Sequence, residues 1–353
     1  MSHLPLTGLK VVELASVLAG PSVGSFLAEM GATVIKVENP KTGGDTTRKW
    51  KTKSEPAGPV SSYYASANWG KQVLFLDLTK TEDLAHVHTL LADADVLLEN
   101  FKPGDDLKFR LDYDAIKALY PKLITGHIQG FPDSDRPAFD VVLQAETGFM
   151  SLNGSDENGL KWPLPIVDIL AAHQLKQGIL LALLERGRTG NGCFVSVSLF
   201  EAAIAALYNV GGNVLMGNSN PVSLGRLHPN IAPYGETITT SDSITLILAV
   251  GTDHQFTELC GALDIDRTTA EKFSTNAARL AEREALENKL RSHARNRTFN
   301  ELEREFILRK IPFGRVKTLK EVIAHLPADS FLHELTEGVE TVRMRTGIFK
   351  IRR

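Results

Sequence analysis

Residues 9–38 of the chain read LKVVELASVLAGPSVGSFLAEMGATVIKVE. The apolar run at 9–14 predicts a strand, and a turn that contains Gly20 and Pro21 follows it. Helical spacing over Val23 to Met30 then leads to a second predicted strand at 33–38. The stretch therefore predicts a β-α-β unit, in which a helix connects two parallel strands.

The same alternation continues along the next hundred residues. Further strands are predicted at 72–78, 95–100 and 122–129, and helices at 81–92 and 112–119. Strands that alternate with helices are typical of a mainly parallel sheet with helices on both faces. The fold class is therefore predicted to be α/β, with a Rossmann-like sheet in a large domain.

A domain boundary is predicted where this periodicity stops. A long helical pattern over 168–186, a strand at 194–199 and a helix at 200–208 precede a Gly- and Asn-rich stretch that ends at Pro221. Beyond it, a hairpin pattern over 236–250 precedes helical patterns at 254–263, 277–293 and 299–308. We expect a large domain over residues 1–220 and a smaller α+β domain over 221–310.

Composition and charge exclude several classes of protein. The 353 residues carry a formal net charge of −3, which provides no positive field for nucleic acid or an anionic membrane. The N-terminus lacks a signal-peptide pattern, and the apolar stretch at 178–184 is far shorter than the ~20 residues of a membrane span. The two cysteines, Cys193 and Cys260, form no metal-binding or disulfide pattern, so we expect a cytoplasmic protein without a metal site.

Three common catalytic or binding motifs fail on their spacing or on their position in the chain. The first turn lacks the Gly-x-Gly-x-x-Gly of a dinucleotide site, so Glu38 is interpreted as an ordinary strand-end acid. Gly20 to Gly24 matches Gly-x-Ser-x-Gly, but only one strand precedes it, whereas a hydrolase nucleophile follows several strands. His86 and His88 are two residues apart on a predicted helix and therefore diverge.

Asp168 is the candidate catalytic residue, because it is an acid embedded in an apolar sequence. It follows Pro165-Ile166-Val167 and precedes Ile169-Leu170. One interpretation is a helix N-cap, which needs only a short side-chain acceptor. The other is a nucleophilic carboxylate, held ionised by the helix N-terminus and partly stripped of water by apolar neighbours. Both interpretations remain open from the residues alone.

An ordered series of segments resembles the family III CoA-transferases, which include formyl-CoA transferase and the L-carnitine dehydratase and bile-acid-inducible proteins. It spans about residues 5 to 325. The matching segments are 9–14, 19–21, 27–38, 44–48, 68–71, 76–78, 94–101, 103–104, 136–140, 144–145, 167–186 and 189–192.

The resemblance implies a CoA-transferase whose nucleophile is Asp168. In this family the aspartate attacks an acyl-CoA thioester, and a mixed anhydride and then an aspartyl-CoA thioester carry the reaction without ATP. The implied substrates are an acyl-CoA and a small carboxylic acid, with succinate as an example from the family, and no permanently bound cofactor is expected. The implied assembly is an interlocked homodimer, in which residues 311–353 return to the large domain.

The resemblance also implies which residues line the binding path of CoA. The resemblance places the CoA path along six residues: Leu18, Ala19, Leu76, Asn100, Phe101 and Lys108. Asn39 stands where some members have an arginine. The phosphates of CoA need local cations in a chain of negative net charge, and the candidates are Lys36, Arg48, Lys71, Lys102 and Lys108.

Two alternatives remain beside the transferase. The α-methylacyl-CoA racemases of the same family use a partner histidine, where this chain has Phe139 before Asp140. Phenylalanine cannot move a proton, so a transferase is favoured; His127 lies elsewhere and is interpreted as structural. A non-catalytic CoA-binding relative is the second alternative. The glycine-rich loop of formyl-CoA transferase has no clear counterpart, and Gly211-Gly212 or Gly217 are the candidates for it.

Overall fold

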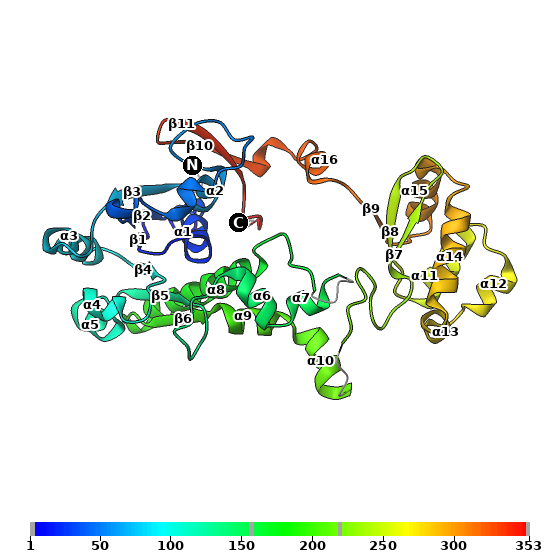
Figure 1. Cartoon of the computed structure of the whole chain (residues 1–353), viewed down its shortest axis with the longest axis horizontal. Helices are drawn as coiled ribbons and strands as arrows, with labels where there is room; N and C mark the ends of the chain where they lie inside the picture. Colours follow the sequence, from blue (N-terminus) through cyan, green and yellow to red (C-terminus); the bar gives the residue numbers. More distant parts are fainter. Residues whose placement is uncertain (1–3, 155–158, 218–220, 351–353) are drawn as a thin grey trace. The chain divides into compact units, whose positions relative to one another are not determined.

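The computed structural model describes residues 4–154, 159–217 and 221–350. The chain divides into two compact units (Figure 1). The first comprises Met1–Phe149, Lys161–Pro221 and Pro327–Arg353, and the second comprises Met150–Leu160 and Val222–Leu326. The chain therefore returns to the first unit at Pro327 rather than at the expected residue 311, because strand β9 (Phe313–Arg315) pairs with strand β8 (Thr245–Ala249) of the second unit.

The first unit contains a six-stranded parallel sheet in the order β3-β2-β1-β4-β5-β6. This is the order of a doubly wound fold, whose ligands bind at the carboxyl edge, where the strand order reverses between β1 and β4. The strands are β1 (Lys10–Glu13), β2 (Thr33–Glu38), β3 (Lys71–Phe75), β4 (Val96–Glu99), β5 (Ile124–Gln129) and β6 (Phe194–Ser198). The predicted α/β class is confirmed.

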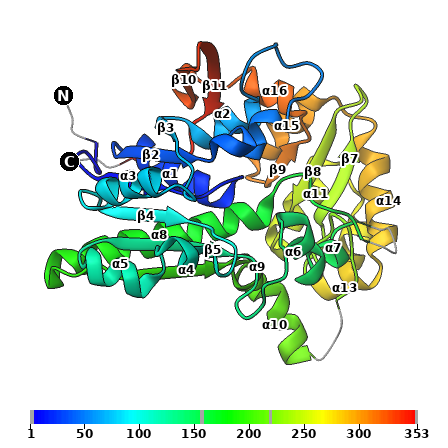
Figure 2. The same cartoon turned by 60° about the vertical axis from the view of Figure 1, so that its left-hand side comes forward.

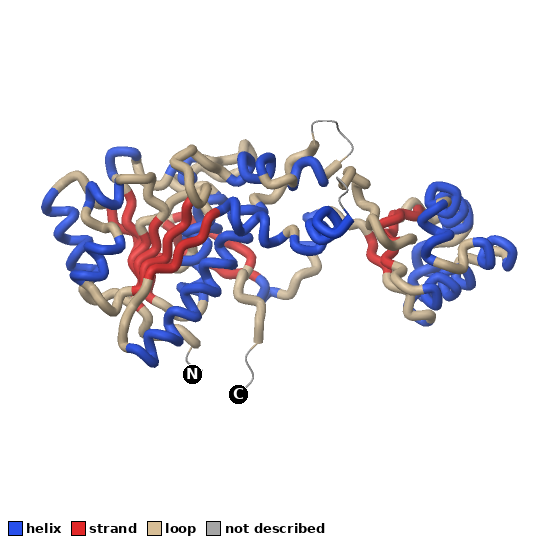
Figure 3. Tube along the Cα trace, turned by 90° about the horizontal axis from the view of Figure 1, so that it is seen from below, coloured by secondary structure: helices blue, strands red, loops and turns tan. Residues whose placement is uncertain are grey.

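Both faces of this sheet bear a hydrophobic core, and Figure 3 shows helices on both sides of it. Val11 contributes to the core under α1 and α8, whereas its neighbour Val12 contributes to the core under α3 and α5, because successive strand residues point to opposite faces. The helices of the first unit are α1 (Ala19–Glu29), α2 (Ser62–Asn68), α3 (Thr81–Leu91), α4 (Asp105–Phe109), α5 (Tyr113–Leu119), α6 (Asp140–Glu146), α8 (Ile166–Thr189), α9 (Leu199–Ala206) and α10 (Tyr208–Gly217), with 3-10 turns η1 (Pro40–Thr42), η2 (Thr46–Lys49) and η3 (Ala328–Ser330). The short helix α7 (Phe149–Leu152) begins at the last residue of the segment Met1–Phe149 and continues into the second unit.

Among the described residues, α8 is the one unbroken helix that is long and apolar enough to cross a bilayer, with a mean hydropathy of 1.3 over its best window. The pair α9 and α10 passes the same test only as one segment bent by 71°. Helix α8 buries Val167, Ala171, Leu175 and Ile179 in the core of the sheet. Packing within the unit therefore accounts for one face of α8, whereas only 33% of its most apolar window is buried.

The second unit contains an antiparallel three-stranded sheet with a core of its own. The predicted hairpin appears as β7 (Tyr234–Thr239) and β8 (Thr245–Ala249). The helix predicted over 277–293 is divided at Glu282, which has φ −123° and ψ 42°. The helices are α11 (Asp253–Ala262), α12 (Arg267–Lys272), α13 (Asn276–Ala281), α14 (Arg283–Ala294), α15 (Phe299–Leu308) and α16 (Leu319–Ile323).

A C-terminal hairpin, β10 (Phe331–Thr336) and β11 (Val339–Met344), belongs to the first unit, and Figure 2 shows it near α2. The buried carboxylate of Glu29, at the end of α1, holds the chain just after β11. Its Oε2 accepts a bond from Arg343 Nη2 at 2.8 Å and from the backbone and hydroxyl of Thr346. Its Oε1 accepts from Gly347 N at 3.0 Å. One side chain therefore anchors the returning segment.

Replacing Glu29 with Gln should weaken this anchor. The substitution leaves the buried guanidinium of Arg343 without its counter-ion, so we expect the free energy of unfolding to fall by about 3 kcal/mol. Urea unfolding measures the loss, and hydrogen exchange should report faster exchange across β11. Glu340→Gln, at an exposed position on the same hairpin, is the control and should change stability by less than about 0.5 kcal/mol. Equal losses in the two variants would contradict the anchoring role.

Candidate active site

Two cavities lie within the first unit, at the carboxyl edge of its parallel sheet. The first has a volume of about 610 Å³ and the second about 830 Å³. Ser16, Phe101 and Lys102 contribute to the walls of both cavities. Ser16 follows β1 and Asn100 follows β4, and two hydrogen bonds of 3.0 and 3.1 Å join Asn100 to the backbone of Ser16. The cavities therefore meet where the strand order reverses, as expected for a ligand site in this fold.

Asp168 lines the second cavity from the first turn of α8. It is not the N-cap, which corrects one interpretation of the sequence: Pro165 occupies that position. The capping acceptor comes from another helix, since Asp140 Oδ1 accepts hydrogen bonds from Val167 N at 2.7 Å and Asp168 N at 3.3 Å. Because Asp140 satisfies these backbone donors, the side chain of Asp168 is free to face the cavity.

The carboxylate of Asp168 forms no hydrogen bond or ion pair with the residues that the structure describes. Burial raises the pKa of Asp168 to about 7, and the nearby negative charge of Asp140 adds to the increase. A carboxylate with this pKa is ionised in part of the molecules at neutral pH. Partial dehydration and the absence of a partner suit a nucleophile.

A second layer of hydrogen bonds fixes the segment before Asp168. Gln144 Nε2 donates to Asp140 Oδ2 at 2.6 Å and to the carbonyl of Leu164 at 3.2 Å. Trp162 N donates to Gln144 Oε1 at 2.8 Å. Asp140 and Gln144 are four residues apart on α6 and share one helix face. The spacing is visible in the sequence, but the loop before α8 that the pair holds is not.

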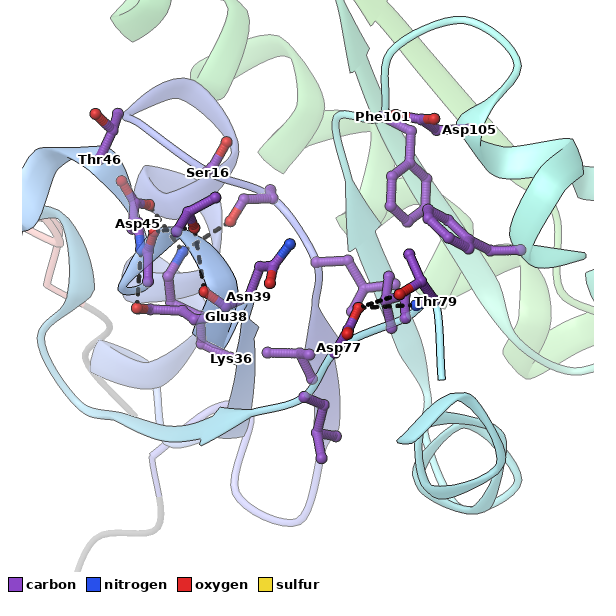
Figure 4. Close-up of a pocket in the computed structure, with 18 of the residues that line it drawn as sticks. Ser16, Lys36, Glu38, Asn39, Asp45, Thr46, Asp77, Thr79, Phe101 and Asp105 are labelled. Atoms are coloured by element: carbon purple, nitrogen blue, oxygen red, sulfur yellow. Dashed lines mark hydrogen bonds and ion pairs between the residues drawn. The ribbon is translucent and has the colours of Figure 1, made fainter. Parts of the chain in front are cut away.

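The predicted CoA residues separate into three groups. Leu18, Ala19, Asn100 and Phe101 line the second cavity together with Asp168. Figure 4 shows the first cavity, which is lined by Lys36, Asn39, Leu76 and again Phe101. Arg48, Lys71 and Lys108 line neither of these two cavities.

Burial in ion pairs corrects the expectation that Lys36, Arg48 and Lys71 are free cations. Lys36 Nζ lies 3.0 Å from Glu13 Oε1 and 3.3 Å from Asp45 Oδ2. Lys71 Nζ lies 2.8 Å from Glu13 Oε2, and Arg48 Nε lies 2.6 Å from Glu38 Oε2. Neighbouring strands thus bring carboxylates against these cations.

The pKa values of these buried lysines differ in direction. Burial by itself lowers the pKa of Lys36, but the surrounding carboxylates of Glu13 and Asp45 raise it above its ordinary value. Burial lowers the pKa of Lys71 to about 7, against the opposing effect of Glu13. Both lysine side chains are paired with buried carboxylates inside the unit.

The exposed cations at the cavities are Lys102, which is among the cations predicted from the sequence, and two residues that are not. Lys49 lines the first cavity, Lys102 lines both, and Arg136 lines the second. Lys49 follows the buried Arg48 directly in the sequence, and no pattern distinguishes which of the two faces outward. Lys108 is exposed on α4, where its ammonium lies 5.2 Å from the ring centre of Phe109.

Two further side chains, Phe139 and His127, line the second cavity with Asp168. Phe139 lines the second cavity with 56% of its surface exposed, so the place of the racemase histidine holds an apolar ring. His127 Nδ1 lies 2.5 Å from Glu99 Oε1. Burial alone lowers the pKa of His127, but Glu99 raises it above its ordinary value.

Tyr63 on α2 is a neighbour that the sequence does not mark. Burial raises the pKa of Tyr63 to about 12, and the charges of Asp168 and Asp140 contribute to the increase. Its ring packs edge-on against Trp50, with centroids 5.2 Å apart. Tyr63 therefore lies within electrostatic reach of Asp168.

The described residues hold no group of three His, Cys, Asp or Glu side chains placed to bind a metal ion. The glycines considered for a loop over the site belong to a helix instead, since Gly211 and Gly212 are inside α10 and Gly217 ends it, and none of them lines either cavity. Helix α10 has no buried residue, so packing within this chain does not explain why it forms.

Asp168→Asn should stabilise the protein at high pH. The folded pKa of about 7 lies above the ordinary 3.8, so the folded state holds a proton that the unfolded state releases, and wild-type stability falls as pH rises from about 4 to 7. At pH 8 we expect the free energy of unfolding of Asp168→Asn to exceed that of wild type by about 2 kcal/mol. This is half the value that the full pKa shift would give, because the side chain is partly exposed. At pH 4 we expect almost no difference. Thermal unfolding at both pH values measures this difference in stability. Glu185→Gln, on the same helix, is the control. A stability difference between Asp168→Asn and wild type that does not depend on pH would contradict the raised pKa of Asp168.

Comparison with known proteins identifies close similarities over nearly the whole chain. A family model described as CoA-transferase family III matches residues 6–353. A succinate–glutarate CoA-transferase of Agrobacterium fabrum is 37% identical over 330 residues, which cover 91% of this chain and 82% of the relative. Succinyl-CoA:glutarate CoA-transferase of Homo sapiens is 30% identical, over 91% of this chain and 73% of the relative. The crystal structure of a CaiB/BaiF family protein from Brucella suis has a TM-score of 0.83 at 36% identity, covering 99% of this chain and 93% of that one.

Proposed function

This chain belongs to CoA-transferase family III, and we propose that it exchanges CoA between small dicarboxylic acids with Asp168 as the nucleophile. The observation that carries the proposal is the partly buried carboxylate of Asp168, which has no partner among the described residues and a raised pKa. It shares one cavity with Leu18, Ala19 and Asn100. A partly buried carboxylate without a partner among the described residues is suited to attack on an activated acyl group.

The proposed reaction begins when the Asp168 carboxylate attacks the thioester carbonyl of the donor. The carbon–sulfur bond breaks, CoA leaves as a thiolate, and an acyl-aspartyl anhydride forms. The thiolate then attacks the aspartyl carbonyl, which releases the donor acid and leaves an aspartyl-CoA thioester. The acceptor carboxylate attacks this thioester and expels the thiolate, which finally attacks the acceptor's acyl carbon and restores Asp168. Every bond broken is matched by one formed, so no ATP is needed.

We assign the two cavities to different ends of CoA. The second cavity, which contains Asp168, would hold the thioester and the adjoining pantetheine arm. The first, with the exposed Lys49 at its wall, would hold the phosphate-bearing end. Lys102 lines both cavities and is placed to neutralise phosphate charge between them. The phosphate partners in this proposal are therefore Lys49 and Lys102, rather than the buried Lys36, Arg48 and Lys71.

Dicarboxylic acids are proposed as substrates because of the relatives' names. They include succinate–glutarate, succinyl-CoA:mesaconate and succinyl-CoA:D-citramalate CoA-transferases. CoA enters as a substrate in this scheme, and no permanently bound cofactor takes part. The free thiols of Cys193 and Cys260 are compatible with a reducing compartment, so we place the reaction in the cytoplasm.

Intact-mass spectrometry after mixing with succinyl-CoA tests the nucleophile. We expect wild type to gain a covalent CoA or succinyl adduct, at an initial rate that rises with pH through about 7 as Asp168 loses its proton. Asp168→Asn should form no adduct. Glu185→Gln, which removes a carboxylate from the other end of α8, should react like wild type.

Three outcomes would contradict the proposal. An adduct that persists in Asp168→Asn would exclude this nucleophile. Binding of CoA without any adduct in wild type would indicate a non-catalytic relative. Deuterium exchange at the α-carbon of a 2-methylacyl-CoA, without an acceptor acid, would indicate a racemase despite Phe139.

We also propose an interlocked homodimer, as expected for the family. Its support is exposed apolar surface in the first unit, on α8 and α10. Leu181 and Leu184 of α8 are 66% and 65% exposed, and Leu215 and Met216 of α10 are 87% and 93% exposed. Neighbouring residues of this size exposed on two helices are typical of surface that a partner covers.

Sedimentation at micromolar concentration measures the assembly. We expect a species of about 77 kDa, twice the 38.6 kDa of the chain. Leu181→Glu combined with Leu184→Glu should shift it toward the monomer, because the exposed leucines pack no core of this chain. Arg188→Glu, exposed near the C-terminal end of the same helix, is the charge-change control. A wild-type monomer would contradict the dimer.

A further inference from the structure

The turn between β1 and α1 contains a strained residue beside both cavities. Val17 has φ +71°, in the left-handed region that a β-branched side chain rarely adopts. Ser16 lines both cavities, and Val17, Leu18 and Ala19 line the second one with Asp168. The wall that faces the proposed nucleophile is therefore built on backbone that would relax to another conformation if nothing held it.

Three side chains hold the backbone of three successive residues in this turn. Lys36 Nζ donates to the carbonyl of Ala15 at 2.7 Å. Asn100 accepts from Ser16 N and donates to Ser16 O. Asp45 Oδ2 accepts from Val17 N at 3.1 Å. These side chains come from β2, from the segment after β4 and from the loop before η2, so the turn is held from several directions.

Hydrogen bonds and an ion pair hold the Asp45 carboxylate itself in place. Its Oδ1 accepts from Thr47 N at 3.0 Å and from Thr47 Oγ1 at 2.8 Å. Its Oδ2 lies 3.3 Å from Lys36 Nζ, and its backbone N–H donates to Glu38 Oε2 at 2.9 Å. Figure 4 shows Asp45, Lys36 and Glu38 close together at one side of the first cavity. Buried charges that moved apart here would each lose a partner, so the group resists displacement.

We propose that Asp45, supported by Lys36, is a positioning residue for the first chemical step. Its Oδ2 holds Val17 in the left-handed conformation, and this conformation sets the wall against which the thioester lies when Asp168 attacks. The inference rests on the proposed function, since it assigns a geometric role within that reaction. Small displacements of reacting groups reduce rates steeply, so a relaxed turn should slow the attack more than it weakens CoA binding.

Asp45→Asn separates the two oxygens of the carboxylate. The amide oxygen can keep both Thr47 bonds at the Oδ1 position, which places the NH₂ group against Val17 N–H and the Lys36 ammonium. We expect the single-turnover rate of adduct formation at saturating succinyl-CoA to fall roughly 10- to 100-fold. The dissociation constant of free CoA, from calorimetry, should change less than about threefold if the effect is on orientation.

Adding Val17→Gly to Asp45→Asn should restore part of the rate. Glycine adopts positive φ without the Cβ penalty, so the turn no longer needs to be forced into this conformation. Thr47→Val is the matched control, because it removes a bond to Oδ1 and leaves Oδ2 and Val17 untouched. It should keep the wild-type rate even where it lowers the melting temperature.

Val17→Pro tests the same idea without changing a buried charge. Proline fixes φ near −65° and has no N–H that could donate a hydrogen bond to Asp45. Val17→Pro should therefore slow adduct formation as Asp45→Asn does. This variant decides the matter if Asp45→Asn does not fold.

The outcomes separate this inference from the proposed function. If wild type forms no adduct, the proposed function fails and this inference falls with it. If wild type reacts and Asp45→Asn or Val17→Pro reacts as fast, only the positioning role is overturned. Loss of rate in Thr47→Val equal to that in Asp45→Asn, or no rescue by Val17→Gly, would also overturn it.

Discussion

The hydrogen bonds from Val167 and Asp168 to the carboxylate of Asp140 are the interactions on which the candidate site depends. A helix N-terminus needs an acceptor for its free N–H groups, and an aspartate at the N-cap is a common one. Here α6 supplies that acceptor, so Asp168 is released from a structural task. The same negative charge, together with burial, raises the pKa of Asp168. The carboxylate of Asp140 therefore orients Asp168 and also contributes to its raised pKa.

The buried charges on the first strands have a related consequence. Placing ions in a protein interior is costly unless each has a partner, and the partners must come from adjacent strands or loops. Glu13, Lys36 and Asp45 meet in this way at the carboxyl edge of the sheet. Their hydrogen bonds reach the β1–α1 turn, which lines the ligand cavities. A network that stabilises the fold thereby also shapes the wall of the site.

The large-scale features were predictable because they depend on local periodicity. The predicted strands at 33–38 and 122–129 correspond to β2 and β5, and the helix at 81–92 corresponds to α3. Pattern reasoning was less successful for the residues at 208–217, where two adjacent glycines favour a loop and the structure has helix α10. The predicted end of the second unit, residue 310, also lies too early in the chain, because β9 belongs to that unit only through its pairing with β8. The pairing of β9 with β8 joins segments far apart in the chain, which a local window of sequence does not contain.

The sequence by itself determined the parallel α/β sheet, the family, and Asp168 as the acid within an apolar run. Only the tertiary structure decided that Asp168 is not the helix cap and that Lys36, Arg48 and Lys71 are not free cations. The physical reason is that capping and charge pairing depend on which groups are brought together in space. Asp140 and Val167 are 27 residues apart, and Glu13 and Lys36 are 23 apart. A pattern read along the chain identifies which residues are charged, whereas the folded sheet determines which of them are already paired.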